Sequence, residues 1–297
     1  MAEKIGILGL GLIGRLTAEL IIPHGYDCYA IRRKSTEDFP EMGGKLVETP
    51  RELAEVSDFL ISALPTVESA RDTFYGEHGV ISGAHENLII IEMNTFPVSI
   101  KEELKDKIDD TPATIIDCPI SGTQPVIRAG KGVIMMSGDK SACEAVKPML
   151  ELVAPKTSYV GDYGTGIKLK LMINFMVGAN TVALAEGMLF GEKMGLDSQT
   201  MLDIVGPSAA GSTVFGMRAA IIAERKWQPC AGPSKLLWKD LDIVQEQADA
   251  LGLSAPLLRI CNEYYKKVEK ADRLEDECAV VFEILEGETK KIVSPDK

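Results

Sequence analysis

The sequence predicts an α/β fold in which a doubly wound, mostly parallel sheet precedes an all-helical domain, with a long central helix joining the two. Three observations predict it. Short apolar runs alternate with helical patterns through the first half of the chain, and the strand signal ends after Gly166. A long helical stretch then covers residues 161–194, uncharged from 171 to 185. For a chain of 297 residues two domains are expected, at residues 1–163 and 164–297.

The composition indicates a soluble globular protein that handles small molecules. Apolar residues make up 45% and charged residues 26% of the chain, and the net charge of −12 opposes binding to a nucleic-acid backbone. The N-terminus lacks a signal-peptide pattern, so a cytoplasmic location is expected. Six scattered cysteines without CxxC spacing indicate reduced thiols, and no metal site is expected.

The first motif is a glycine turn between a strand and a helix. Residues 4–8 form an apolar strand-like run, and a helical pattern covers residues 12–22. Glycines between them allow the backbone to approach a pyrophosphate, which the helix N-terminus would bind, so a Rossmann domain for a dinucleotide is expected. A glycine-rich turn without a ligand is the alternative. The candidate cofactor-binding residues are Gly9, Leu10, Gly11, Leu12, Ile13 and Gly14.

The type of dinucleotide is predicted by the residues that follow the second strand. A NAD site usually places an acidic residue there for the ribose 2′-hydroxyl. This chain instead has Arg32, Arg33 and Lys34, and guanidinium groups form charge-assisted, often bidentate bonds to a 2′-phosphate. NADP(H) is therefore favoured over NAD(H), the alternative being a solvated basic loop.

Further apolar runs continue the alternation, and candidate site residues follow them. A helix is expected at residues 50–56, because Thr49 and Glu52 have capping-box spacing. The expected strands lie at residues 59–64, 88–93, 115–118, 132–137 and 157–160. In such a sheet the ligand lies off the carboxyl ends of the strands, so we expect the residues there to line one crevice. These residues, each an ordinary loop residue if taken alone, are Leu64, Pro65, Thr95 and Ser121.

The central helix carries the candidate catalytic group. Lys170 and Asn174 lie at i and i+4 and therefore on one face. Residues 171–185 carry no charge, but this run is shorter than the about 18 residues of a membrane span, so a buried helix and no membrane partner are expected. A lysine that faces a core is costly unless it is paired or lines a cleft. The alternative is that Lys170 lies in an exposed first turn beside Lys168.

The second half of the chain is expected to be helical. Apolar helices rich in small residues suggest burial against another subunit, so a homodimer or homotetramer is expected. The polar tail at residues 287–297 is expected to fray. The expected helices cover residues 201–205, 212–223, 236–251, 256–271 and 276–285.

Two motifs of the first half resemble those of a known family. The chain is similar to the β-hydroxyacid dehydrogenases, the family that contains 3-hydroxyisobutyrate dehydrogenase, tartronate semialdehyde reductase and the short-chain semialdehyde reductases. Its glycine turn matches that family's cofactor fingerprint, and DCPISGT at residues 117–123 looks like the DAPVSGG substrate motif. The resemblance implies that Ser121, Gly122 and Thr123 bind a substrate carboxylate.

The central helix extends this resemblance over nearly the whole chain. Gly164, Gly166, Lys170 and Asn174 match the family's GxGxxxKxxxN motif. The resemblance implies that Lys170 is the acid and base of hydride transfer, protonating a carbonyl oxygen in reduction, and that Asn174 holds the substrate.

A downstream pair, Lys239 and Asp240, matches the family's KD pair. By the same resemblance Lys239 and Thr95 contact the cofactor. The chain departs from the family at Thr123, where a second glycine is usual, and in the loop at residues 227–238, which lacks a phenylalanine. Both departures bear on the substrate and not on the chemistry.

We therefore expect an NADPH-dependent reductase, or the reverse dehydrogenase, for a small carboxylated aldehyde such as glyoxylate or succinic semialdehyde. An imine reductase, which resembles this architecture but generally lacks the lysine, is the alternative among enzymes. A catalytically silent dinucleotide-binding scaffold is the alternative of another class. The three histidines, His24, His78 and His85, fall outside every motif, so a histidine-driven mechanism is not expected.

Overall fold

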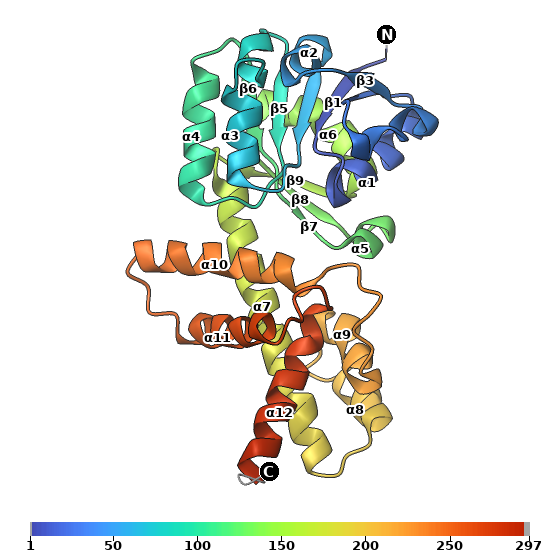
Figure 1. Ribbon diagram of the computed structural model, residues 1–297, viewed down its shortest axis with the longest axis vertical. Coiled ribbons are helices and arrows are strands. Elements are labelled where there is room, and N and C mark those ends of the chain that lie inside the picture. The colour runs from blue at the N-terminus through green and yellow to red at the C-terminus, as the bar shows by residue number, and fades with distance from the viewer. Residues whose placement is uncertain (1, 294–297) are drawn as a thin grey trace. The chain divides into compact units, whose positions relative to one another are not determined.

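The computed structural model describes residues 2–293. They form two compact units, which divide between Lys170 and Leu171. The first unit is a sheet covered by helices and the second is helical, which confirms the predicted fold class (Figure 1). The division falls after Lys170, inside the long helix α7 (Thr165–Lys193), whereas the sequence placed the boundary before this helix. The first turn of α7 therefore belongs with the sheet.

A nine-stranded, mostly parallel sheet forms the centre of the first unit. In spatial order its strands are β3 (Lys45–Val47), β2 (Asp27–Ile31), β1 (Lys4–Leu8), β4 (Phe59–Ser62), β5 (Ile89–Glu92), β6 (Thr114–Asp117), β8 (Val133–Ser137) and β7 (Ile120–Ser121), with β9 (Lys156–Gly161) paired to β8. All neighbours from β3 to β6 are parallel, whereas β8 is antiparallel to both β6 and β7. The strand direction therefore reverses between β6 and its neighbour β8.

Helices pack on both faces of this sheet, as the alternation of buried strand residues requires. Ile91 packs with α1 (Leu12–Ile21) and α6 (Lys140–Val153), while its neighbour Ile90 packs with the helices of the other face. Those helices are α2 (Pro50–Val56), α3 (Val67–Tyr75) and α4 (Val98–Asp109). The remaining helical elements are α5 (Gln124–Arg128) and the 3₁₀ turns Ile22–His24, Lys34–Thr36, Phe39–Met42 and Val80–Gly83.

The second unit consists of the rest of α7 and five further α-helices. These are α8 (Ser198–Val205), α9 (Thr213–Glu224), α10 (Ser234–Ala250), α11 (Pro256–Lys270) and α12 (Val281–Val293), the last preceded by the 3₁₀ turn Cys278–Val280. The segment that was expected to fray continues α12 as far as Val293, and residues 294–297 lie outside the described part. Two ion pairs lie along this polar part of α12: Lys290 pairs with Glu286 in the same helix, and Lys267 of α11 pairs with Glu288.

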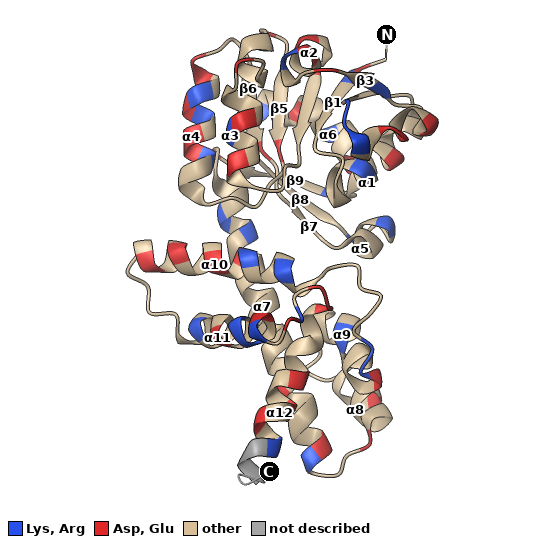
Figure 2. Ribbon diagram, viewed as in Figure 1, with Lys and Arg blue, Asp and Glu red and all other residues tan. Residues whose placement is uncertain are grey.

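Helix α7 is 29 residues long, and Figure 2 shows that its middle carries no charge. By length and composition it is the one helix of the described part that could cross a membrane, a test that the core helix of a soluble protein also passes. The sequence-based expectation that this run is too short to cross a membrane rested on residues 171–185 alone. The whole helix is long enough to do so.

Candidate active site

Three glycines lie in the turn after β1, and two of them have no room for a side chain. Gly9 has φ +91°, and a Cβ on it would overlap the carbonyl oxygen of Ala63. A Cβ on Gly14 would overlap the carbonyl oxygen of Gly9, so α1 lies against the turn as only glycine allows. A Cβ on Gly11, in contrast, would meet nothing within 4 Å. Gly9 and Gly14 therefore close the turn, while the space beside Gly11 is open.

The N-terminus of α1 fits an anion. Gly11 is its N-cap, no side chain caps it, and its first turn contains no acidic residue. Leu10 and Ile13 pack against the core, whereas Leu12 is 49% exposed. Uncapped N–H groups at the positive end of a helix bind phosphate groups. The turn therefore fits the pyrophosphate of a dinucleotide.

In the basic segment after β2, the two arginines differ in whether their side chains are already paired. Arg32 Nε donates to Glu48 Oε1 at 2.7 Å on the surface. The Thr36 hydroxyl accepts from the Arg33 N–H at 2.8 Å and donates to the Ile31 carbonyl, which fixes the turn. Within residues 2–293 the exposed side chain of Arg33 forms no ion pair. Arg33 is therefore better placed than Arg32 to pair with an anion.

The ends of β4 and β5 lie beside the glycine turn. Leu64 and Pro65 follow β4, and Thr95 follows β5. The register joins the last residue of β1 to Ser62 at the end of β4, and Ser62 to the last residue of β5. Because these strands are parallel, the predicted cofactor-binding residues of the first unit all lie at the carboxyl ends of the strands, on the same side of the sheet.

Ser121, Gly122 and Thr123 do not form the simple loop after β6 that the sequence suggested. Ser121 belongs to the short strand β7, opposite Val133 of β8. Gly122 has φ +140°, and Thr123 is the N-cap of α5, although its side chain makes no capping hydrogen bond. The segment therefore crosses from a strand to a helix N-terminus, where hydroxyl and N–H groups can meet a carboxylate.

Lys170 and Asn174 lie one turn apart on α7, as predicted from their spacing. Lys170 is the last residue of the first unit, and Asn174 belongs to the second. The buried Asn174 Nδ2 donates to Asp240 Oδ2 at 2.7 Å, and Lys239 Nζ lies 3.1 Å from Asp240 Oδ1. The KD pair of α10 therefore orients Asn174.

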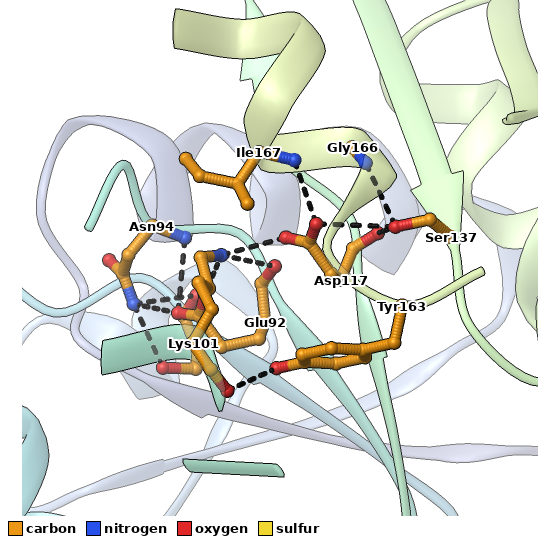
Figure 3. Close-up of polar contacts among 9 residues, drawn as sticks. Glu92, Asn94, Lys101, Asp117, Ser137, Tyr163, Gly166 and Ile167 are labelled. Carbon is orange, nitrogen blue, oxygen red and sulfur yellow. Dashed lines mark hydrogen bonds and ion pairs between the residues drawn. The ribbon is translucent and has the colours of Figure 1, made fainter. Parts of the chain in front are cut away.

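A buried charged network lies under the ends of β5 and β6, and the sequence analysis missed it (Figure 3). Lys101 Nζ of α4 donates to Asp117 Oδ1 at 2.9 Å and also to Glu92, and the three side chains are 0% exposed. The Asn94 amide donates to Glu92 and, at 3.0 Å, to the Ser62 hydroxyl. The available signal was an acidic residue at the end of each of two apolar strands.

The ionisation of this network follows from its burial. Burial raises the pKa of the Glu92 carboxyl, although Lys101 opposes the shift. Burial opposes the charge on Lys101, but the carboxylates of Asp117 and Glu92 outweigh it and raise the pKa of its ammonium. Lys101 therefore stays charged, and Glu92 takes up a proton more readily than an exposed glutamate.

The network ends on the first turn of α7. The Ile167 N–H donates to Asp117 Oδ2 at 2.8 Å, and the Gly166 N–H donates to Ser137 Oγ at 3.0 Å. Figure 3 shows the two N–H groups directed at these side chains. The helix that carries Lys170 is thus attached to the ends of two strands.

Cysteines and histidines take no part in these clusters. The six cysteines are free, and burial raises the pKa of the Cys118 thiol well above its ordinary value. His24 bonds to the carbonyl of Leu20 and His85 to that of Ala54. In the part of the chain that the structure describes, no three acidic, cysteine or histidine side chains are grouped to hold a metal.

Two family profiles match the chain. The profile for the NAD-binding domain of 6-phosphogluconate dehydrogenase matches residues 4–161. The profile for the NAD-binding region of NADP-dependent 3-hydroxyisobutyrate dehydrogenase matches residues 164–284. Between them they extend over the sheet, α7 and most of the helical unit.

Individual proteins show the same similarity. The chain is 27% identical over 286 residues to glyoxylate/succinic semialdehyde reductase 2, chloroplastic, of Arabidopsis thaliana, covering 96% of this chain and 80% of the relative. It is 30% identical over 247 residues to the probable 3-hydroxyisobutyrate dehydrogenase-like 3, mitochondrial, of the same plant, covering 82% and 77%. Its fold is similar to that of Mycobacterium tuberculosis 3-hydroxyisobutyrate dehydrogenase, with a TM-score of 0.86, 23% identity and coverage of 96% and 99%.

Proposed function

Because the chain belongs to the 3-hydroxyisobutyrate dehydrogenase family of NAD(P)-dependent hydroxyacid dehydrogenases, we propose that it is an NADP(H)-dependent reductase of small carboxylated aldehydes. The observation that carries the proposal is the spacing of Lys170 and Asn174, which lie one turn apart on α7. Glyoxylate and succinic semialdehyde are the leading substrates, since a relative that matches 96% of the chain is named for both.

In this proposal each group has one task. Ser121, Gly122 and Thr123 hold the substrate carboxylate through hydroxyl and N–H groups. Lys170 gives its proton to the carbonyl oxygen during reduction and takes the hydroxyl proton during oxidation. Asn174, oriented by Asp240, holds the reacting end of the substrate.

The cofactor is held by the glycine turn and the sheet edge. Gly9, Gly11 and Gly14 accommodate the pyrophosphate, and Thr95 and Lys239 are further proposed contacts. Bound NADPH would supply the hydride. Arg33 supports the preference for NADP(H), because its guanidinium is exposed and forms no ion pair among the described residues.

The assembly proposed is a homodimer or homotetramer in the cytoplasm. Apolar side chains exposed on α7 support it: Met172, Met176 and Phe190 are 52%, 54% and 64% exposed. Light scattering tests the assembly, and a monomeric mass would contradict it.

The proposal is tested by NADPH oxidation with glyoxylate, succinic semialdehyde, tartronate semialdehyde and methylmalonate semialdehyde. We expect Lys170→Ala to lower kcat by about two to four orders of magnitude, because the proton donor is lost. Lys168→Ala, an exposed lysine of the same turn, is the matched control and should keep its activity. Equal turnover by Lys170→Ala and wild type would refute the role of Lys170. A wild type that binds NADPH but reduces none of the four compounds would favour the imine reductase or scaffold alternative.

A further inference from the structure

The first turn of α7 receives its hydrogen-bond acceptors from distant strands. Ser137 Oγ of β8 accepts from the Gly166 N–H, and Asp117 Oδ2 of β6 accepts from the Ile167 N–H. The first N–H groups of a helix have no partner inside the helix, and a carboxylate is favourable beside them because the helix dipole is positive there. Asp117 thus stabilises the start of α7 by hydrogen bonding and by charge.

Asp117 is itself fixed from both sides. Its Oδ1 accepts from Lys101, and its Oδ2 accepts from Ile167 and, at 3.2 Å, from the Ser137 hydroxyl. The side chains of Asp117, Lys101 and Ser137 are 0% exposed, so bulk water does not compete for their hydrogen bonds. The carboxylate is therefore held in one position, and this position determines where α7 begins.

The two glycines before Lys170 fit this attachment. Gly164 has φ +86°, which lets the chain turn from β9 into the helix. A Cβ on Gly166 would lie 2.7 Å from the carbonyl oxygen of Met135 and 2.9 Å from Asp117 Oδ2. Any side chain at residue 166 would push α7 away from β6 and β8. The close approach of the helix therefore requires Gly166.

Lys170 lies in the turn that follows this attachment. It is four residues after Gly166, about 6 Å along the helix axis, and belongs to the same compact unit as the network. Asp117 is also the first residue of the segment that ends in Ser121, Gly122 and Thr123. One short segment thus contains the group that fixes α7 and the groups proposed to bind the substrate.

We propose that Asp117, held by Lys101, is a positioning residue that fixes the Lys170 turn of α7 relative to the substrate-binding segment. The inference rests on the proposed role of Lys170 in proton transfer. Because the Asp117 side chain is 0% exposed, it acts without contacting a ligand, by fixing the position of the lysine ammonium. Proton transfer is sensitive to such placement, since a displacement of about 1 Å can lower a rate about a hundredfold.

The test compares three variants of the full-length protein with a control on the same helix. Gly166→Ala displaces α7 sterically, Asp117→Asn removes the charge beside its first turn, and Ser137→Ala removes one acceptor with the least disturbance. Gly187→Ala is the control, because a Cβ there would meet nothing within 4 Å. We expect kcat to fall about tenfold to a hundredfold in Gly166→Ala and Asp117→Asn and less in Ser137→Ala. The dissociation constant of NADPH should stay within about twofold, and the control should match wild type.

Amide hydrogen exchange supplies a readout that does not depend on turnover. Protection of residues 164–170 should decrease in the three variants, while that of β1 and α1 stays unchanged. A lower kcat with unchanged NADPH binding supports the inference. Unchanged kcat in variants that lose this protection would overturn the inference alone, as would a kcat loss matched by an equal loss of NADPH affinity. A wild type without turnover would overturn the proposed function and this inference with it. If Asp117→Asn does not fold, Gly166→Ala and Ser137→Ala decide.

Discussion

Two of the helices that begin beside the sheet, α1 and α7, start in opposite ways. Helix α1 begins at Gly11, where no side chain caps the N–H groups and a Cβ would meet only open space. Helix α7 begins on Asp117 and Ser137, where Gly166 has no room for a Cβ. An open N-terminus is available to a ligand anion, whereas a closed one holds the helix in place. On the proposed roles, the positive end of a helix serves ligand binding in α1 and positioning in α7.

The largest expected effect concerns the closed N-terminus. Lys101→Met leaves Glu92 and Asp117 buried without their cation, so the free energy of unfolding should fall by about 3–5 kcal/mol in urea denaturation. Lys105→Met, which breaks an exposed pair with Asp109 on the same helix, is the control and should cost about 0.5 kcal/mol. Equal losses in the two variants would show that the buried network does not stabilise the unit.

The next effect concerns the open N-terminus. Gly11→Ala adds a methyl group where the backbone would approach the pyrophosphate, so the dissociation constant of NADPH should rise about tenfold or more, measured by fluorescence titration. The melting temperature should not fall, since the free chain has room for the group. Gly216→Ala in α9, also without neighbours within 4 Å, should leave NADPH binding unchanged. Unchanged affinity in Gly11→Ala would place the pyrophosphate elsewhere.

A smaller effect separates the two arginines after β2. Arg33→Ala should weaken NADPH about tenfold and leave NADH unchanged, because one charge-assisted contact to the 2′-phosphate is lost. Arg32→Ala should weaken NADPH less, because Glu48 already pairs with Arg32. Equal losses for NADPH and NADH would mean that this segment does not contact a 2′-phosphate.

The smallest effect is a dependence of stability on pH. The pKa of Glu92 is raised from its ordinary value of 4.5, so between pH 4.5 and the higher folded pKa the folded protein holds a proton that the unfolded chain releases. The free energy of unfolding should therefore fall as pH rises through this window, by at most about 1.4 kcal/mol per pH unit. Glu92→Gln should remove this contribution, whereas Glu86→Gln, an exposed control, should keep it. The same slope in Glu92→Gln and wild type would contradict the assignment.

The sequence predicted best those elements whose signals are local. Strand β1 matches its expected range, and α2 begins at Pro50 as the Thr49 cap indicates, since the Glu52 N–H donates to the Thr49 hydroxyl. Strand β7 was missed because two residues give no periodicity. The last turns of α12 were missed because residues 287–293 are mostly polar, and the pair of Lys267 with Glu288, which joins α11 to α12, is not visible in a local pattern.

The candidate site divides in the same way. The glycine turn and the spacing of Lys170 and Asn174 could be predicted, because each lies within one element. The Lys101 network could not, because its members come from β5, β6 and α4, and only the folded sheet brings them together. The roles of these residues in binding and catalysis stay predictions until the variants are measured.

Thr123 lies where the preferred substrate could change during evolution with little effect on the fold. The Asp117 carboxylate is held by three partners, whereas Thr123, six residues later, is half-buried and its side chain makes no capping hydrogen bond. Replacing Thr123 disturbs little of the fold, while replacing Asp117 disturbs the start of α7. On the proposed roles, an exchange of Thr123 would alter the acid that this chain accepts while the geometry of proton transfer at Lys170 is retained.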